Sequence, residues 1–174
     1  MKFRWIFILI ILYCFMKLVE FKKIYEEIRK KHSLPDFEDL NMDFDIGKIR
    51  RDSGNLIRDI RRVMMEKIVY YVRLVEVMVN PSQASPIMLM LLKDINSDDK
   101  KVIDSVMNNF VELEIASHKL DVLSSVQEES KLINHINSTW NKKRNEVMHL
   151  VKILEKNLQN KPESITKKSR DYFN

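Results

Sequence analysis

The chain has few of the residues that end or bend secondary structure. Its 174 residues include 2 glycines and 4 prolines. Because these two residues mark most turns, their scarcity favours long helices over a fold of many short strands. A glycine-rich phosphate-binding loop is also excluded, since neither Gly47 nor Gly54 precedes a Lys-Ser/Thr pair at the required spacing.

The chain also has a single cysteine, Cys14. One thiol can form neither an intramolecular disulfide nor a cysteine metal cluster. The length leaves room for one modest domain with a single core.

A run of 12 consecutive apolar residues begins at the fifth position. Its members are Trp5, Ile6, Phe7, Ile8, Leu9, Ile10, Ile11, Leu12, Tyr13, Cys14, Phe15 and Met16. A cleaved signal peptide has basic residues before such a run, as here, but it also has small residues after it, and none follow here. We therefore predict an uncleaved, single-pass membrane anchor that contacts membrane lipids. Two alternatives stay open, a signal peptide and a buried helix, because 12 residues rise only about 18 Å against a hydrocarbon core of roughly 30 Å.

Basic residues set the predicted orientation. Six lysines and arginines follow the apolar run within residues 17–31, and only Lys2 and Arg4 precede it. Since cytoplasmic flanks are enriched in Lys and Arg, this bias places the domain after the anchor in the cytoplasm.

Composition and charge divide the rest of the chain. We predict four segments: an anchor helix with a basic juxtamembrane stalk over residues 1–33, an acidic linker over 34–45, a helical bundle over 46–160, and a polar, basic tail over 161–174. The linker contains five acids, while the whole chain carries a net charge of +5.

Apolar periodicity predicts the fold class. Residues 56–78 and the segments after Asn96 and Ser125 repeat apolar side chains every 3.5 to 3.6 positions, as amphipathic helices do. Ser85 before Pro86 predicts a further, short apolar helix. The sequence therefore predicts an all-α fold, with the hydrophobic N-terminal helix followed by an antiparallel three- to four-helix bundle of coiled-coil-like packing. Such stripes also predict a protein partner or a homo-oligomer.

Basic side chains cluster in the first long helix of this bundle. Arg51, Arg58 and Arg62 share one face, and Arg61 lies beside them. We predict that these four arginines contact anionic lipid headgroups or an acidic partner. Nucleic-acid phosphates are a less favoured alternative, and pairing with nearby acids of the chain is a third.

One pair of residues has metal-ligand spacing. Glu146 and His149 lie one turn apart on a helix, as in di-iron bundles, but those bundles need a second such pair and two more glutamates. We therefore predict no catalytic, cofactor-binding or metal site, and no small-molecule substrate.

These observations predict a membrane-anchored, non-enzymatic helical adaptor or scaffold. The alternative is a basic helical nucleic-acid-binding module, in which the N-terminal run is a buried or oligomerisation helix. A helical metalloenzyme that uses Glu146 and His149 is the weakest of the three hypotheses.

Overall fold

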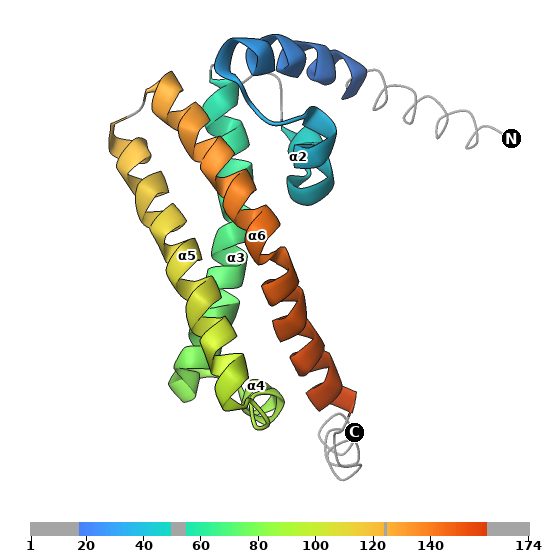
Figure 1. The fold of residues 1–174 in the computed structure, drawn as a ribbon, viewed down its shortest axis with the longest axis vertical. Helices are drawn as coiled ribbons and strands as arrows, with labels where there is room; N and C mark the ends of the chain where they lie inside the picture. Colours follow the sequence, from blue (N-terminus) through green and yellow to red (C-terminus); the bar gives the residue numbers. More distant parts are fainter. Residues whose placement is uncertain (1–17, 50–54, 124, 160–174) are drawn as a thin grey trace, which may run out of the picture. The chain divides into compact units, whose positions relative to one another are not determined.

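A computed structural model describes residues 18–49, 55–123 and 125–159 (Figure 1). Residues 18–32 are helical, and the elements that follow are α2 (Phe37–Phe44), η1 (Ile46–Lys48), α3 (Leu56–Val79), η2 (Pro81–Gln83), α4 (Pro86–Leu91), α5 (Ser97–Val122) and α6 (Val126–Gln159). All regular structure in the described residues is helical. The predicted all-α helical bundle is therefore confirmed.

The predicted single-pass membrane location is contradicted. Across the three described segments, no helix is both long enough and apolar enough to span a bilayer. In the described helix over residues 18–32, Phe21 and Tyr25 are buried within the protein, where both rings contact Phe37. These two rings therefore pack on protein, whereas Leu18, Val19 and Ile24 are exposed and the lysines of this helix stay at the surface. The twelve residues predicted as the anchor, 5–16, lie outside the described residues.

The described residues form two compact units. Unit 1 combines the described residues up to Val69 with Glu112–Trp140, and unit 2 combines Tyr70–Val111 with the described residues from Asn141 onward. Helices α3, α5 and α6 contribute residues to both units. The predicted division into anchor, linker, bundle and tail follows chain order and stays a prediction.

The segment predicted as an acidic linker contains α2, in unit 1. Phe37, Leu40 and Phe44 of α2 are buried and lie at helical spacings of three and four. The acidic side chains occupy the outer face, where Glu38 pairs with Lys22 and Asp36 with Arg29. The segment is therefore an amphipathic helix packed on its neighbours, since its apolar side chains stabilise it there.

The predicted helix starts in unit 2 are confirmed. The Ser85 side chain accepts a hydrogen bond from the Met88 amide at 3.3 Å, which caps α4. The Asn96 side chain accepts from the amides of Asp98 and Asp99 at 2.8 and 2.9 Å, which caps α5. These bonds satisfy amides that the helices themselves leave unpaired. The core of unit 2 includes Val106 and Phe110 of α5 and Leu150 of α6, all buried as their periodicity predicts.

Candidate functional site

Arg61 of α3 is buried in unit 1, with a side chain 1% exposed. Its guanidinium donates to Glu129 Oε2 at 2.7 Å, to Ser117 Oγ at 2.5 Å and to Asp121 Oδ1 at 2.7 Å. Glu129 is itself fully buried. The hydrogen bond from Arg61 holds the pKa of Asp121 below its usual value. This cluster joins α3, α5 and α6, and its polar groups bond to one another.

The arginines predicted as a contact surface meet these same carboxylates. Arg58 Nε lies 3.5 Å from Glu129 Oε1, and Arg62 Nη2 lies 3.6 Å from Asp121 Oδ1. Arg51 lies outside the described residues. Arg61 is buried and Arg58 is partly buried, whereas the Arg62 side chain is 54% exposed. Contact of these arginines with lipid headgroups or an acidic partner stays a prediction.

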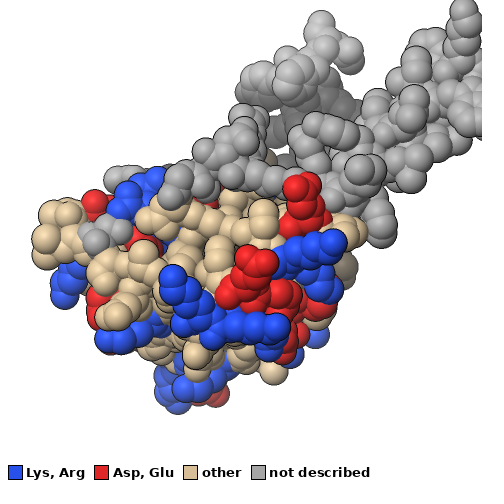
Figure 2. Space-filling view, turned by 90° about the horizontal axis from the view of Figure 1, so that it is seen from above, with Lys and Arg blue, Asp and Glu red and all other residues tan. Residues whose placement is uncertain are grey.

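Opposite charges also alternate on the face seen in Figure 2, where lysine and arginine side chains lie among aspartates and glutamates. Ion pairs within unit 1 include those of Lys22 with Glu38 and of Lys131 with Glu128. Nucleic-acid binding normally needs a continuous basic surface. The face seen in Figure 2 carries charges of both signs, and nucleic-acid binding stays an untested alternative.

Lys67 of α3 lies against two aromatic rings of unit 1. Its ammonium nitrogen is 4.1 Å from the centroid of Trp140 and 5.4 Å from that of Phe44, and it donates to the Asp43 carbonyl. Burial lowers the pKa of Lys67. This cation–π arrangement attaches α2 to α3 and α6.

Glu146 and His149 of α6 each bond to a different partner in unit 2. Glu146 accepts from Lys143 Nζ at 2.9 Å, whereas His149 Nε2 lies 2.9 Å from Asp99 Oδ1. The two side chains therefore do not converge on one point. The part of the chain that the structure describes contains no group of three His, Cys, Asp or Glu residues able to hold a metal ion.

Asp99 joins the start of α5 to α6 and gives the stability of unit 2 a dependence on pH. Its burial alone raises the pKa, but hydrogen bonds from His149 and from the Asn96 amide outweigh burial and lower it. A carboxyl group with a lowered folded-state pKa contributes stability above its unfolded pKa, about 3.9, and loses it as the pH falls through the folded value.

Asp99→Asn is therefore expected to destabilise the protein at pH 7 by about 1.5 kcal/mol, the low end for a hydrogen bond to a charged group, because His149 is half exposed. This deficit should shrink as the pH falls below about 4. Urea unfolding of both proteins at a series of pH values measures it. Asp98→Asn, at an exposed neighbouring position, is the control. A deficit that does not change with pH contradicts the assignment.

Helix α4 is the strongest candidate for a binding surface. Its sequence, PIMLML, contains only apolar residues, and none of them is buried. Ile87 is 57% exposed and Leu89 is 47% exposed, and Val79 at the end of α3 is 53% exposed. The end of α3 and α4 lie at the same end of unit 2 (Figure 1). Exposed apolar surface of this kind marks sites of interaction with other molecules.

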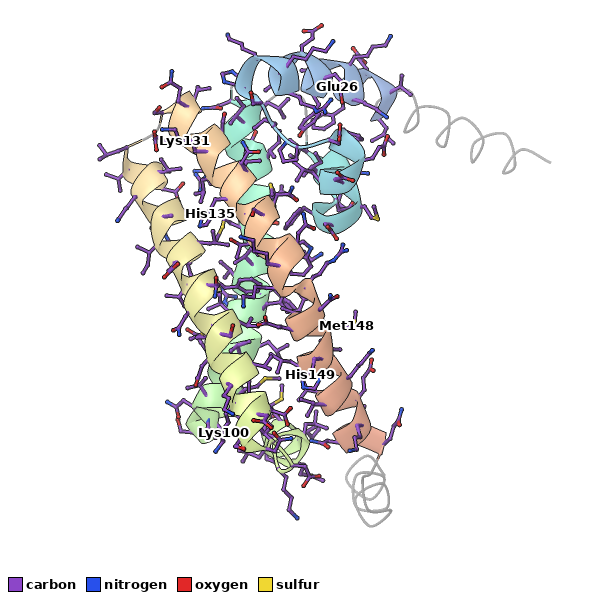
Figure 3. All side chains as sticks on the ribbon, in the orientation of Figure 1. Glu26, Lys100, Lys131, His135, Met148 and His149 are labelled. Atoms are coloured by element: carbon purple, nitrogen blue, oxygen red, sulfur yellow. The ribbon has the colours of Figure 1, made fainter. Side chains whose placement is uncertain are left out.

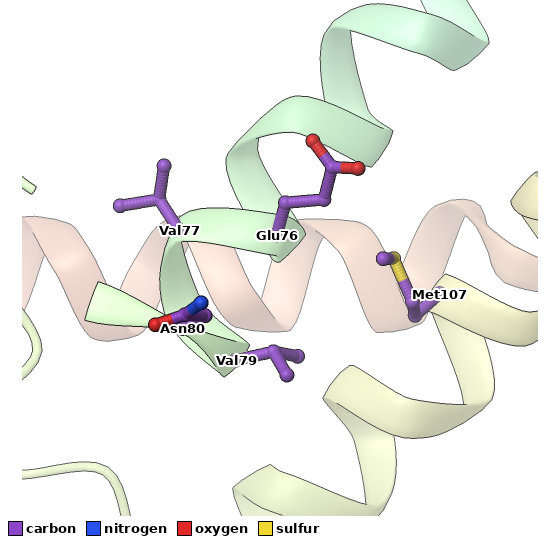
Figure 4. Close-up of a pocket in the computed structure, with 5 residues that line it drawn as sticks. All are labelled: Glu76, Val77, Val79, Asn80 and Met107. Carbon is purple, nitrogen blue, oxygen red and sulfur yellow. The ribbon is translucent and has the colours of Figure 1, made fainter. Parts of the chain in front are cut away.

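A small pocket lies at the end of α3 (Figure 4). It is lined by Glu76, Val77, Val79 and Asn80, with Met107 of α5 facing them, and its volume is about 320 Å³. Most of its lining side chains are apolar, and Glu76 supplies a single carboxylate. The pocket therefore suits one large apolar side chain with a cation nearby.

Comparison with known proteins adds no assignment: no family model matches the chain, and no curated protein or solved structure is significantly similar to it. The function must therefore be inferred from the geometry of the chain itself.

Proposed function

We propose that the protein is a non-enzymatic helical adaptor that binds a protein partner through unit 2. The binding region, called the α4 surface below, consists of Val79, Ile87, Leu89 and the pocket lined by Val77 and Met107. The observation that supports the proposal is that an entirely apolar helix has no buried residue.

Polar bonds hold α4 in place without covering its apolar side chains. Ser85 caps its first turn, and the Asn157 side chain of α6 donates to the Leu91 carbonyl at 2.7 Å. Between these two points Ile87 and Leu89 stay exposed, whereas Met88 and Met90 are half-buried. Burying one isoleucine or leucine fully is worth about 1.5–3 kcal/mol. A partner that covers the exposed parts of Ile87 and Leu89 gains a share of that energy.

The pocket indicates the chemistry of the partner. A volume of about 320 Å³ admits one anchoring side chain, and Glu76 at the pocket attracts a positive charge. The expected partner segment therefore combines a large apolar or aromatic residue with a nearby lysine or arginine. Anchors of this type provide most of the binding energy in many interfaces.

The α4 surface is tested by placing charge on it. Ile87→Asp with Leu89→Asp is expected to weaken partner binding by about 100-fold, because two carboxylates would have to be buried without hydrogen-bond partners. Proximity labelling in the native cells, followed by affinity measurement with the purified partner, provides the readout.

Met148→Asp is the matched control, since Met148 is 53% exposed and lies in the same unit on α6 (Figure 3). Circular dichroism checks that both variants are folded. Partner binding that survives the α4 substitutions, or that Met148→Asp weakens equally, contradicts the proposal.

A further inference from the structure

The end of α6 lies directly beside α4. Asn157 is 8% exposed, and its bond to the Leu91 carbonyl joins the last turns of α6 to the last residue of α4. Helix α6 ends at Gln159. Gln159, the last described residue, is two positions after Asn157, so the end of the described chain lies near α4.

The sequence of residues 160–174 has the chemistry that the α4 surface fits. It reads NKPESITKKSRDYFN and contains two adjacent aromatic residues, Tyr172 and Phe173. The cations Lys167, Lys168 and Arg170 precede them. Aromatic side chains complement the exposed faces of α4, and the cations complement Glu76 at the pocket.

We propose that residues 167–173 cover the α4 surface of their own molecule and compete with the partner for it. The competition rests on the proposed function, whereas the covering itself does not. Chain length permits the contact: the 13 residues from Gln159 to Tyr172 can extend over about 43 Å, whereas the six residues of α4 rise about 9 Å.

Because the tail and the α4 surface belong to the same chain, even a weak contact between them is enough to cover α4 for much of the time. A short connecting chain holds its two ends at an effective concentration of the order of millimolar. A tail segment with an intrinsic dissociation constant near that value covers α4 about half of the time. The apparent affinity of the partner falls in proportion to the fraction of molecules that are covered.

Thiol labelling measures this covering without any partner. In a Cys14→Ser background, which removes the single native thiol, Leu89→Cys places a thiol on the exposed face of α4. Combining it with Tyr172→Ser and Phe173→Ser is expected to speed labelling of this thiol by about twofold, because the covered half of the molecules becomes accessible. Ile87→Cys provides a second reporter on the same helix.

Met148→Cys is the matched control, since its side chain is similarly exposed but lies on α6. Its labelling rate is expected to be the same with either tail. Equal rates at position 89 with both tails overturn the proposal, and so does an equal acceleration at position 148. Protection of position 89 that depends on protein concentration also overturns it, because a second copy of the chain is then the occupant.

Binding of the partner is measured separately, so the two proposals can fail independently. If position 89 labels at equal rates but Ile87→Asp with Leu89→Asp still abolishes partner binding, the adaptor function stands and the covering by the tail does not. If labelling changes as expected while no partner depends on α4, the covering stands alone.

Discussion

Replacing Arg61 with methionine is expected to lower the free energy of unfolding by about 3–5 kcal/mol, the cost of breaking a buried ion pair. The substitution leaves Glu129, which is fully buried, without its hydrogen bond from Arg61 Nε at 2.7 Å. Ser117 loses its bond from the same guanidinium. Urea unfolding followed by circular dichroism measures the change, with the linear dependence on denaturant extrapolated to water.

Two further variants show whether burial of the charge causes this loss. Arg58→Met removes a longer, partly exposed contact with Glu129 and is expected to cost 1 kcal/mol or less. Arg61→Met combined with Glu129→Gln is expected to cost less than the sum of its single changes, because the buried carboxylate that Arg61 binds is then replaced by a neutral amide. Equal losses for Arg61→Met and Arg58→Met, or additive effects in the double variant, contradict this account.

Replacing Trp140 with alanine is expected to destabilise the protein by about 3–5 kcal/mol, as large-to-small substitutions of core aromatic residues do. The Trp140 side chain is 5% exposed and its ring centroid lies 5.8 Å from that of Phe44. The same ring faces the ammonium of Lys67. The substitution therefore leaves a cavity beside α2 and removes the aromatic partner of a desolvated cation.

Trp140→Phe is the control for ring contact, because it keeps an aromatic face against Lys67 while losing volume. It is expected to cost about half as much as the alanine substitution or less. Thermal unfolding and urea unfolding of the two variants under the same conditions measure the difference. A loss below 1 kcal/mol for Trp140→Ala, or the same loss for both variants, rules out a core role for this ring.

Helix-capping residues and apolar periodicity predicted most of the helices. The caps at Ser85 and Asn96 fall where the sequence placed them, because capping depends on residues only two or three positions apart. The predicted helix over 56–78 matches α3 to within one residue. Ile103, Val106 and Phe110 of α5 follow helical spacing and form one buried face.

The sequence predicted an acidic linker where the structure contains α2. Five acids over residues 34–45 pointed to a solvated linker. The positions of Phe37, Leu40 and Phe44 already followed a helical face, and that face is buried. Acidic residues on the other face are compatible with packing, since they pair with basic residues of the preceding helix.

The burial of Arg61 could not be read from its own helix. Its partners lie 56 to 68 positions further along the chain. One signal was present: Glu129 is four residues before Ile133, in line with the apolar stripe of α6, and a carboxylate on such a stripe needs a cation. The sequence did not predict the exposure of α4 either, because a buried core helix contains the same kind of apolar run.

The wide sequence separation around Arg61 affects synthesis of the chain. Glu129 follows Arg61 by 68 residues, so at about 5–20 residues per second the ribosome needs roughly 3 to 14 s to supply this carboxylate. Until then the Arg61 guanidinium lacks its buried partner, Glu129, and stays hydrated. The core of unit 1 therefore cannot be completed before Glu129 has been synthesised. Until α6 is present, this part of α3 is exposed to solvent.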